Sequence, residues 1–369
     1  MEEIKKCIVK AAGFLDRTAG VLDTNGIVIA STDPRLDGEE DSSVRAILLS
    51  DDPVSITSDR TYMKITVGDK VSFICFIEGT DTVSRNYLEL LGNWISAALQ
   101  ERNADAERDA FLKNVLLENE LPGDIPLKAR EFKIPYASAR IAFIVKVDAD
   151  DGIDCMEILH NLFPDRKSDH LLAIDEETIV LLKDYTRIMG TNIDDVAGLI
   201  LDNLNAESMS KVYIGIGMPA ETLKDAAKSY REASLALTVG EIFENEKYIV
   251  RYDKLGLGRL IYQLPPTLCH MFLDEVFPND AYDALDSETL LTIQKFFENN
   301  LNGSETSRQL FVHRNTLVYR LDKVQKITAL DLRNFDDAVL FKLASMVRKY
   351  LEKQDRNAFR HGNGKWWRS

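Results

Sequence analysis

A cluster of cationic and amide side chains near the C-terminus is suited to reading nucleic acid. Arg314 and Asn315 open a stretch with helical periodicity. A guanidinium matches the hydrogen-bonding edge of guanine in the major groove, and a carboxamide matches that of adenine. We therefore predict base readout by Arg314 and Asn315. Phosphate contacts that set the orientation are expected from His313, Thr316, Tyr319 and Arg320, with Lys323 on the same DNA-facing side.

The residues around this cluster predict a helix-turn-helix. Ser304 can cap a first short helix, and Ser307 is small enough for a second helix to approach. Leu310 and Phe311 are the expected apolar anchors of the first helix. The second helix has an inward stripe at i, i+4 and i+7, formed by Leu317, Leu321 and Val324. The alternative is an ordinary amphipathic helix pair whose charges are merely solvated.

Charge is distributed unevenly along the 369 residues. The whole chain has a formal net charge of -15, yet between residues 304 and 327 basic residues outnumber acidic ones. The basic residues of this stretch are Arg308, Arg314, Arg320, Lys323 and Lys326, against Glu305 and Asp322. An acidic protein with one cationic element attracts a polyanion at that element and repels it elsewhere.

The run from Leu310 to Leu321, LFVHRNTLVYRL, resembles the C-terminal DNA-binding signature of the carbohydrate-diacid and purine-catabolism regulators, the CdaR/PucR family. The resemblance continues through residues 328–332 and 336–338, where the family has a short loop followed by a closing helix. It implies a bacterial-type transcription regulator whose upstream part senses a small molecule.

Composition and length exclude several other classes of protein. A chain of 369 residues with 45% hydrophobic residues is long enough for two or three domains. The absence of a signal-like or membrane-length apolar run predicts a cytoplasmic protein. The four cysteines are isolated and the five histidines are scattered, so we expect reduced, buried thiols and neither a metal site nor a cofactor.

The first 84 residues predict a PAS-like ligand-sensing domain built on a small antiparallel sheet. A short amphipathic helix over 4–15 precedes two strands that flank Asn25-Gly26, a strong hairpin signal of the type I′ turn. A second hairpin is expected over 62–67 and 71–77, joined across Gly68-Asp69-Lys70.

The segment 21–35 also resembles the sugar-diacid recognition domain of the same family, which implies that the loop 31–38 faces an effector. Candidate effector-binding residues are Ser31, Asp33, Arg35 and Arg45, because a guanidinium grips a carboxylate with two hydrogen bonds. Alternatively, Asp33-Pro34-Arg35 is a turn with a solvated charge. The acidic run Glu39-Glu40-Asp41 departs from the family pattern and would repel a dicarboxylate.

Residues 85–121 are interpreted as a connector helix that pairs with its twin in a homodimer. Its stripe of Tyr87, Leu91, Trp94 and Ala98 has coiled-coil-like spacing, widened by Leu88, Ile95 and Leu99. A polar stretch follows at 101–109. The alternative is a surface helix packed on its own domain.

Residues 122–255 predict a ferredoxin-like domain of βαββαβ order with helices on one face of the sheet, resembling the degenerate GGDEF-like domain of these regulators. The expected hairpin turn, Asp175-Glu176-Glu177, lacks the glycines that a nucleotide cyclase needs there. Asp148 and Asp150 stand where metal ligands would be needed, but acids at a strand end are usually solvated.

These elements predict an α+β multidomain chain. A helical linker is expected over 256–285, an all-α helix-turn-helix domain over 286–353 with a closing helix over 338–350, and a mobile tail over 354–369. The predicted function is an effector-controlled, sequence-specific transcription regulator of carbon or purine catabolism genes that binds operator DNA as a homodimer and is not an enzyme. The rival hypotheses are a nucleotide-binding or nucleotide-cyclising enzyme of the GGDEF fold and a module that binds partners other than DNA.

Overall fold

A computed structural model describes residues 1–68, 70–147, 155–187, 192–207, 211–243 and 247–360 of the chain. The chain divides into two compact units, the first ending at Leu112 and the second beginning at Lys113. Each unit is described by itself. Together they show the mixture of antiparallel sheet, α/β sheet and helices that the sequence predicted for an α+β multidomain fold.

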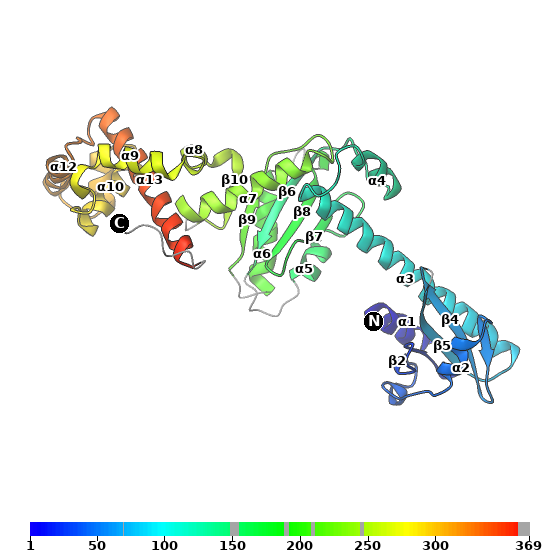
Figure 1. Ribbon diagram of the computed structural model, residues 1–369. Helices are drawn as coiled ribbons and strands as arrows, with labels where there is room; N and C mark the ends of the chain where they lie inside the picture. The colour runs from blue at the N-terminus through cyan, green and yellow to red at the C-terminus, as the bar shows by residue number, and fades with distance from the viewer. Residues whose placement is uncertain (69, 148–154, 188–191, 208–210, 244–246, 361–369) are drawn as a thin grey trace. The chain divides into compact units, whose positions relative to one another are not determined.

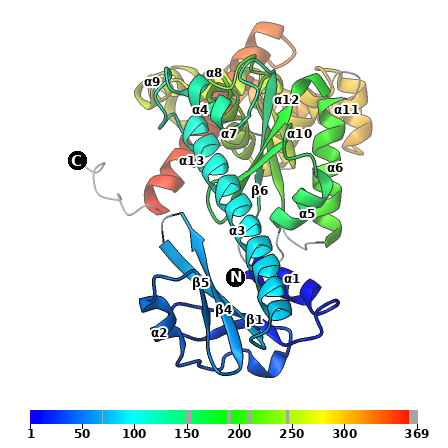
Figure 2. The same ribbon diagram turned by 90° about the vertical axis from the view of Figure 1, so that its right-hand side faces the viewer.

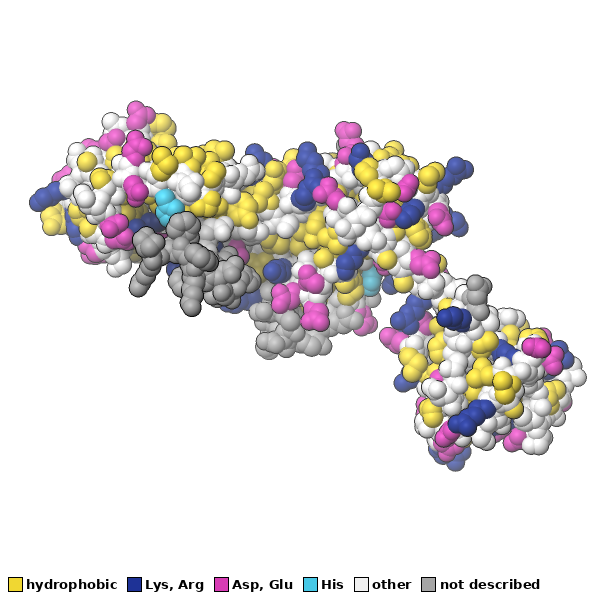
Figure 3. Space-filling model, in the orientation of Figure 1, with side chains coloured by type: hydrophobic (Ala, Val, Ile, Leu, Met, Phe, Trp, Pro, Cys, Tyr) yellow, Lys and Arg dark blue, Asp and Glu magenta, His cyan; other side chains and the backbone are white. Residues whose placement is uncertain are grey.

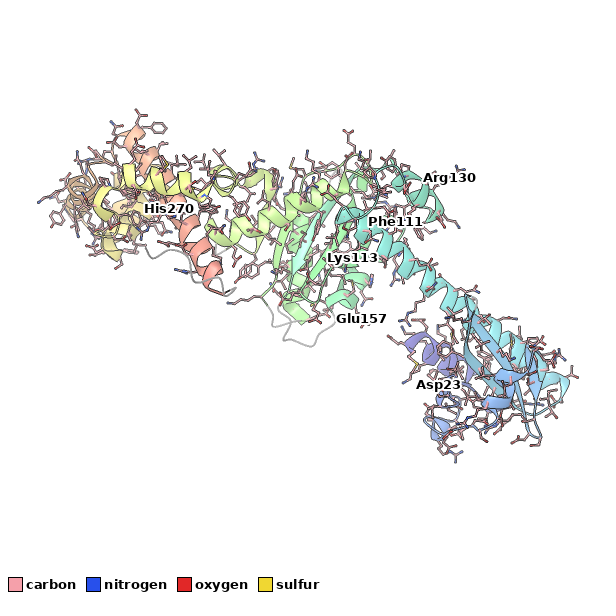
Figure 4. The ribbon with its side chains drawn as sticks, in the orientation of Figure 1. Asp23, Phe111, Lys113, Arg130, Glu157 and His270 are labelled. Carbon is pink, nitrogen blue, oxygen red and sulfur yellow. The ribbon has the colours of Figure 1, made fainter. Side chains whose placement is uncertain are left out.

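The N-terminal unit is built on a five-stranded antiparallel sheet with the order β2-β1-β5-β4-β3 (Figure 1). The strands are β1 (Ala19–Leu22), β2 (Val28–Ser31), β3 (Val54–Ile56), β4 (Arg60–Val67) and β5 (Lys70–Glu78). Both predicted hairpins are present, although Asp69 lies outside the described residues. The first turn is not type I′, because only Gly26 has a positive φ and Asp23 (Figure 4) closes the loop through the amides of Asn25 and Ile27.

Helices cover both faces of this sheet. Helix α1 (Glu2–Ala11) and helix α3 (Thr82–Leu116) pack on one face, against β-strand residues such as Val21, Cys75 and Ile77. The short η1 (Pro34–Leu36) and α2 (Val44–Leu49) pack on the other face, against Ile74 and Phe76. Alternating side chains of β5 therefore contribute to two separate cores, as the period of two in a strand requires.

The stripe assigned to dimerisation mostly faces the helix's own domain. Leu88, Leu91, Ile95 and Leu99 of α3 are buried in the core of the N-terminal unit, and Tyr87 and Ala98 pack against it. Of the predicted stripe, Trp94 remains at the surface, beside Phe14 with 6.4 Å between ring centroids. The stripe, widened by Leu88, Ile95 and Leu99, is apolar enough to cover one face of the sheet. Its residues therefore pack within the domain, although the dimer interpretation required the same residues at an interface between two copies. Homodimerisation remains a prediction.

The second unit contains another five-stranded sheet, with the order β10-β9-β6-β8-β7. It comprises β6 (Arg140–Lys146), β7 (His170–Ala173), β8 (Thr178–Asp184), β9 (Tyr213–Ile216) and β10 (Ile249–Arg251), of which only the β9-β10 pairing is parallel. The intervening helices are α4 (Ile125–Glu131), α5 (Cys155–Leu162), α6 (Ile193–Glu207) and α7 (Ala226–Phe243), with η3 (Tyr185–Arg187) after β8. The predicted βαββαβ order is confirmed.

The two helices of the βαββαβ unit, α5 and α6, lie on one face of this sheet as predicted, whereas the following helix α7 lies on the opposite face (Figure 2). The reason is the alternation along β9, where Ile214 and Ile216 point toward α5 and α6. Gly215 and the following Gly217 present no side chain to α7, which lets the helix backbone approach the sheet closely.

The C-terminal part is entirely helical. It contains η4 (Tyr252–Lys254), α8 (Leu257–Tyr262), α9 (Pro266–Val276), η5 (Pro278–Asp280), α10 (Ser287–Glu298), α11 (Gly303–Gln309), α12 (Arg314–Thr328) and α13 (Phe335–Arg360). Helix α13 is longer than the expected 338–350, because its second half packs on α8 and α9 through Val347, Tyr350 and Leu351. The helix thus includes residues 354–360 of the expected tail, and residues 361–369 lie outside the described residues.

Within the described residues, no helix is both long enough and apolar enough to cross a membrane. Cys7, Cys75, Cys155 and Cys269 are buried and form no disulfide, as the sequence predicted. Burial raises the pKa of Cys75 to about 12, which keeps this thiol protonated at neutral pH.

The close approach of α7 to β9 yields a stability prediction. Replacing Gly217 with alanine would place a Cβ 2.0 Å from the backbone oxygen of Ser229, a clash that only a backbone shift can relieve. We expect Gly217→Ala to lower the free energy of unfolding by about 2 kcal/mol or more, measured by calorimetry. Gly198→Ala on α6 is the matched control, because its Cβ meets nothing within 4 Å. A loss for Gly217→Ala no larger than for Gly198→Ala would contradict the packing described here.

Candidate nucleic-acid interface

Helices α11 and α12 form a helix-turn-helix supported by α10 and α13. The predicted inward stripe is confirmed, since Leu317, Leu321 and Val324 of α12 are buried in one cluster with Phe296 of α10 and Phe341 of α13. This apolar stripe fixes which side of α12 is left for the solvent.

The first helix of the motif begins two residues earlier than a Ser304 cap implies. The side chain of Asn302 accepts hydrogen bonds from the amides of Ser304 and Glu305 at 3.1 and 3.2 Å, so Asn302 is the N-cap. Ser307 is buried, and a Cβ added at Gly303 would lie 3.4 Å from Leu317. The small residues therefore let α11 and α12 pack closely, as the sequence predicted for Ser307.

The turn between the helices is closed by two backbone hydrogen bonds. The amide of Phe311 donates to Arg308 at 3.2 Å, and that of Val312 donates to Ser307 at 3.0 Å. This helix ending requires a left-handed residue, a position that usually carries glycine, but Phe311 occupies it with φ 55°. The expectation that Phe311 anchors the first helix was wrong, because its side chain is 96% exposed.

The residues predicted to read bases lie free at the start of α12. His313 is the N-cap, with its Nδ1 accepting from the amide of Asn315 at 3.2 Å. The side chains of Arg314 and Asn315 are exposed, and among the described residues none forms a hydrogen bond or ion pair with them. Tyr319 is 70% exposed on the outward face and Thr316 is partly exposed. Val318, which the sequence reasoning missed, is exposed between Asn315 and Tyr319 on that face.

Two predicted DNA contacts are turned toward α10 instead. The guanidinium of Arg320 pairs with Glu288 and donates to the hydroxyl of Thr292 at 3.0 Å, leaving its side chain 13% exposed. Lys323 pairs with Asp286, the residue that caps α10 through the amide of Thr289. The hydrogen bond from Lys323 lowers the pKa of Asp286, so this carboxylate stays ionised at neutral pH. Both pairs tie the recognition helix to its support.

Sequence alone could not separate these cations from Arg314, because their partners lie 28 to 37 positions away in α10. On the face shown in Figure 3, Lys and Arg side chains lie beside hydrophobic ones over the C-terminal helices that include α12. The surface at the tip of the motif therefore combines positive charge with apolar area.

The four candidate effector residues do not converge on a pocket. The Ser31 hydroxyl donates to Ala19 on β1, and Asp33 caps η1 and holds Arg35 with contacts of 2.7 and 3.0 Å. The side chain of Arg35 is 88% exposed, and Arg45 is exposed on α2. These contacts are those of a turn with a solvated charge, the alternative interpretation of Asp33-Pro34-Arg35.

A cavity of about 340 Å³ lies nearby, lined by other residues. Its walls include Val28 and Leu36, and its polar lining comprises the carboxylates of Glu39, Glu40, Asp41 and Asp59 together with Arg60 and Tyr62. Asp41 accepts from the Tyr62 hydroxyl at 2.7 Å and from Arg60 at 3.3 Å. The Nε of Arg60 is buried without a hydrogen-bond partner. The predicted acidic run therefore does line a pocket, although the guanidinium inside it is Arg60.

Burial and hydrogen bonding act in opposite directions on Asp41. Burial alone would raise the pKa of this carboxyl, but hydrogen bonds from the Tyr62 hydroxyl and the Ser43 amide outweigh it, and the pKa lies below its ordinary value. Burial and the hydrogen bond to Asp41 raise the pKa of Tyr62. Asp41 is therefore an anion and Tyr62 a neutral donor at physiological pH, and acidic residues outnumber basic ones four to one among the residues that line the cavity.

The middle domain shows little that could support nucleotide chemistry. The Asp175 carboxylate accepts from the amide of Glu177 at 3.0 Å and thereby closes its own hairpin turn. Asp148 and Asp150 lie outside the described residues. Among the residues that the structure describes, no group of three or more His, Cys, Asp or Glu side chains could hold a metal ion.

The fold and the exposed end of α12 define a multidomain chain with a C-terminal helix-turn-helix. The family described as the PucR C-terminal helix-turn-helix domain matches residues 289–347, and the GGDEF-like domain matches residues 118–239. Together with the relatives below, these matches show that the chain is similar to carbohydrate-diacid and purine-catabolism regulators, in agreement with the resemblance of its motif.

Several of the curated relatives are named as regulators. The chain is 27% identical to the carbohydrate diacid regulator of Escherichia coli K12 over 64% of this chain and 64% of that protein. It is 23% identical to the purine catabolism regulatory protein of Bacillus subtilis over 72% of this chain and 54% of that protein. It is 26% identical to the proline-responsive transcriptional activator PutR of B. subtilis over 50% of this chain and 46% of that protein. The chain thus spans roughly half to two thirds of the length of these relatives.

Among solved structures, the regulator of polyketide synthase expression from Bifidobacterium adolescentis matches 64% of this chain and 95% of that chain. The sequence identity is 16% and the TM-score is 0.31.

The left-handed Phe311 yields a prediction for stability. Phe311→Gly should raise the free energy of unfolding of the C-terminal part by about 1 kcal/mol, because glycine adopts a positive φ without a steric penalty. Calorimetry of the full chain measures this change. The matched control is Phe335→Gly, at the exposed first residue of α13, where glycine should lower helix stability. If both variants lost stability equally, the Phe311 ring would have to contribute packing that the structure does not show.

Proposed function

We propose that this chain is a sequence-specific DNA-binding transcription regulator whose operator affinity is controlled by a small molecule bound in its N-terminal unit. The observation that carries the proposal is the start of α12, where Arg314 and Asn315 project without intramolecular partners from a helix held by its apolar stripe. Such residues at the start of a recognition helix reach base edges in the major groove.

The ion pairs of α12 indicate two different roles for its polar residues. Arg314 and Asn315 read bases, and His313, Thr316 and Tyr319 lie where they can contact the DNA backbone. Arg320 and Lys323 orient α12 through ion pairs with Glu288 and Asp286. These pairs also neutralise two carboxylates near the proposed DNA-binding surface. Arg320 is thus proposed as a positioning residue rather than as a direct phosphate contact.

The proposed assembly is a homodimer on operator DNA. A regulator that binds operator DNA would act in the cytoplasm. Two-fold symmetric operators require two recognition helices, and a dimer supplies them. Val83, Leu90 and Trp94 leave apolar side chains exposed on α3 that a second copy can cover. The GGDEF-like domain is proposed to support the regulator without catalysis, because its hairpin turn lacks the glycines of an active cyclase.

The role of Arg314 can be tested with a duplex selected by the full chain from a random-sequence library. Arg314→Ala is expected to weaken binding to that duplex by about 1 to 3 kcal/mol and to relax specificity at one base pair, because a bidentate guanine contact is lost. Competition titrations against random DNA at two salt concentrations measure both effects.

The comparison variant for this test is Arg320→Ala. It should weaken binding to all sequences and also lower the unfolding temperature, because Glu288 loses its partner. Arg314→Ala should leave the unfolding temperature unchanged. Equal losses on selected and random DNA for Arg314→Ala would remove the basis for assigning base readout to Arg314.

The effector is proposed to bind in the cavity between residues 39–43 and 59–62, with Arg60 and Tyr62 as its polar contacts. Four carboxylates around one guanidinium disfavour a dianion and favour a zwitterion or a cation. A sugar diacid, proline and a purine base represent the chemistry named in the relatives' descriptions. Of these three, we expect the sugar diacid to bind worst.

Thermal-shift measurements with these three probes test the cavity. A compound at 100 times its dissociation constant stabilises the folded chain by about 2.7 kcal/mol, which is readily detected. We expect Arg60→Ala to abolish the shift caused by whichever probe stabilises the wild type, and Arg45→Ala, outside the cavity, to preserve it. Loss of the shift in Arg45→Ala but not in Arg60→Ala would instead favour the candidate effector residues that the sequence suggested, of which Arg45 is one. A sugar diacid that stabilises the chain best would contradict the charge argument.

A further inference from the structure

Phe311 is the most exposed of the large hydrophobic side chains that the structure describes. Its ring is 96% exposed, and its backbone has φ 55°, a conformation that bulky residues rarely adopt. Neither packing nor backbone preference accounts for a phenylalanine here, because glycine would suit the backbone better and a polar side chain would suit the solvent better. A residue that is unfavourable in both respects is expected where it contacts something outside the chain.

The turn holds Phe311 next to the base-reading end of α12. The hydrogen bonds from the amides of Phe311 and Val312 to Arg308 and Ser307 fix the backbone, and Val312 is partly buried. The ring is therefore presented from an ordered turn. It lies three positions before Arg314, the first residue of the recognition helix.

The charges around Phe311 indicate the kind of surface that it contacts. Arg308 precedes it with a side chain that is 77% exposed, and Arg314 follows it with no partner among the described residues. Glu305, the partner of Arg308, lies on the first turn of α11. An exposed aromatic residue that lies between two exposed arginines along the chain matches a polyanion that also presents an apolar group. The apolar surface of a protein partner would leave both guanidinium groups desolvated.

We propose that Phe311 is a specificity-determining residue that contacts the 5-methyl group of a thymine in the major groove, beside the base read by Arg314. The thymine methyl is the apolar feature of the major groove, and phenylalanine is among the side chains that contact it. This inference rests on the proposed DNA-binding function. It adds a thymine requirement that hydrogen bonding by Arg314 and Asn315 does not supply.

The test removes the methyl group without altering base pairing. A duplex is selected from a random-sequence library by the full wild-type chain, and each thymine in it is then replaced singly by deoxyuridine. Wild type should lose about fourfold in affinity at one thymine per half-site, the equivalent of one buried methyl group. Phe311→Ala should bind the unmodified duplex about fourfold more weakly, and the same deoxyuridine substitution should cause it no further loss.

Two further variants separate the contact from effects on folding. Phe311→Gly should be more stable than wild type and yet as indifferent to the thymine methyl as Phe311→Ala. Phe335→Ala removes another exposed aromatic side chain of the same domain and should retain the wild-type response to deoxyuridine.

The outcomes distinguish this inference from the proposed function. If the wild type selects no duplex, DNA binding itself fails and the inference fails with it. If Arg314→Ala loses sequence preference but every deoxyuridine substitution affects wild type and Phe311→Ala equally, the regulator stands and Phe311 does not read thymine. A change in oligomeric state of Phe311→Ala with unaltered DNA affinity would also overturn the inference, because it would assign the ring to a protein contact.

Discussion

The geometry of the DNA-facing surface depends on the burial of one stripe of α12. Leu317, Leu321 and Val324 lie in a core shared with α10 and α13, and this fixes the rotation of the helix about its axis. Once the rotation is fixed, Asn315 and Tyr319 must point outward and Arg320 must point toward α10. Deleting a buried leucine in such a core typically costs about 2 to 5 kcal/mol, far more than a surface ion pair contributes. The ion pairs therefore refine an orientation that apolar burial has already selected.

Ion pairs within the second unit occupy two of the cations of α12. Glu288 and Asp286 engage Arg320 and Lys323, so these two cations are not available to a distant phosphate without breaking an existing pair. Arg314 has no such partner among the described residues. In a chain with a net charge of -15, this arrangement directs a polyanion toward the start of α12.

Two residues, Phe311 and Arg60, have features that lower local stability and that packing within the chain does not explain. Phe311 combines a left-handed backbone with an exposed ring, and Arg60 keeps a buried Nε without a partner beside four carboxylates. Departures of this kind are expected at binding sites, where a ligand supplies the missing contact. One lies in the helix-turn-helix and the other in the N-terminal unit, which agrees with a protein that binds DNA at one part and an effector at another.

Local patterns in the sequence predicted the two hairpins of the N-terminal sheet, the βαββαβ order of the second sheet and the position of the helix-turn-helix. The hairpins and the stripe of α12 follow from short-range periodicity and from residue chemistry, which depend on neighbours within a few positions. The partners of Arg320 and Lys323, the face covered by α7 and the lining of the cavity depend on residues far apart in sequence. Tertiary structure alone decided them, because a cation or an apolar stripe has the same local pattern whether its partner is solvent, DNA or its own domain. The exposure of the Phe311 ring could not be predicted from the sequence either. Only the close packing of α11 and α12 decided that the ring would stay outside the core.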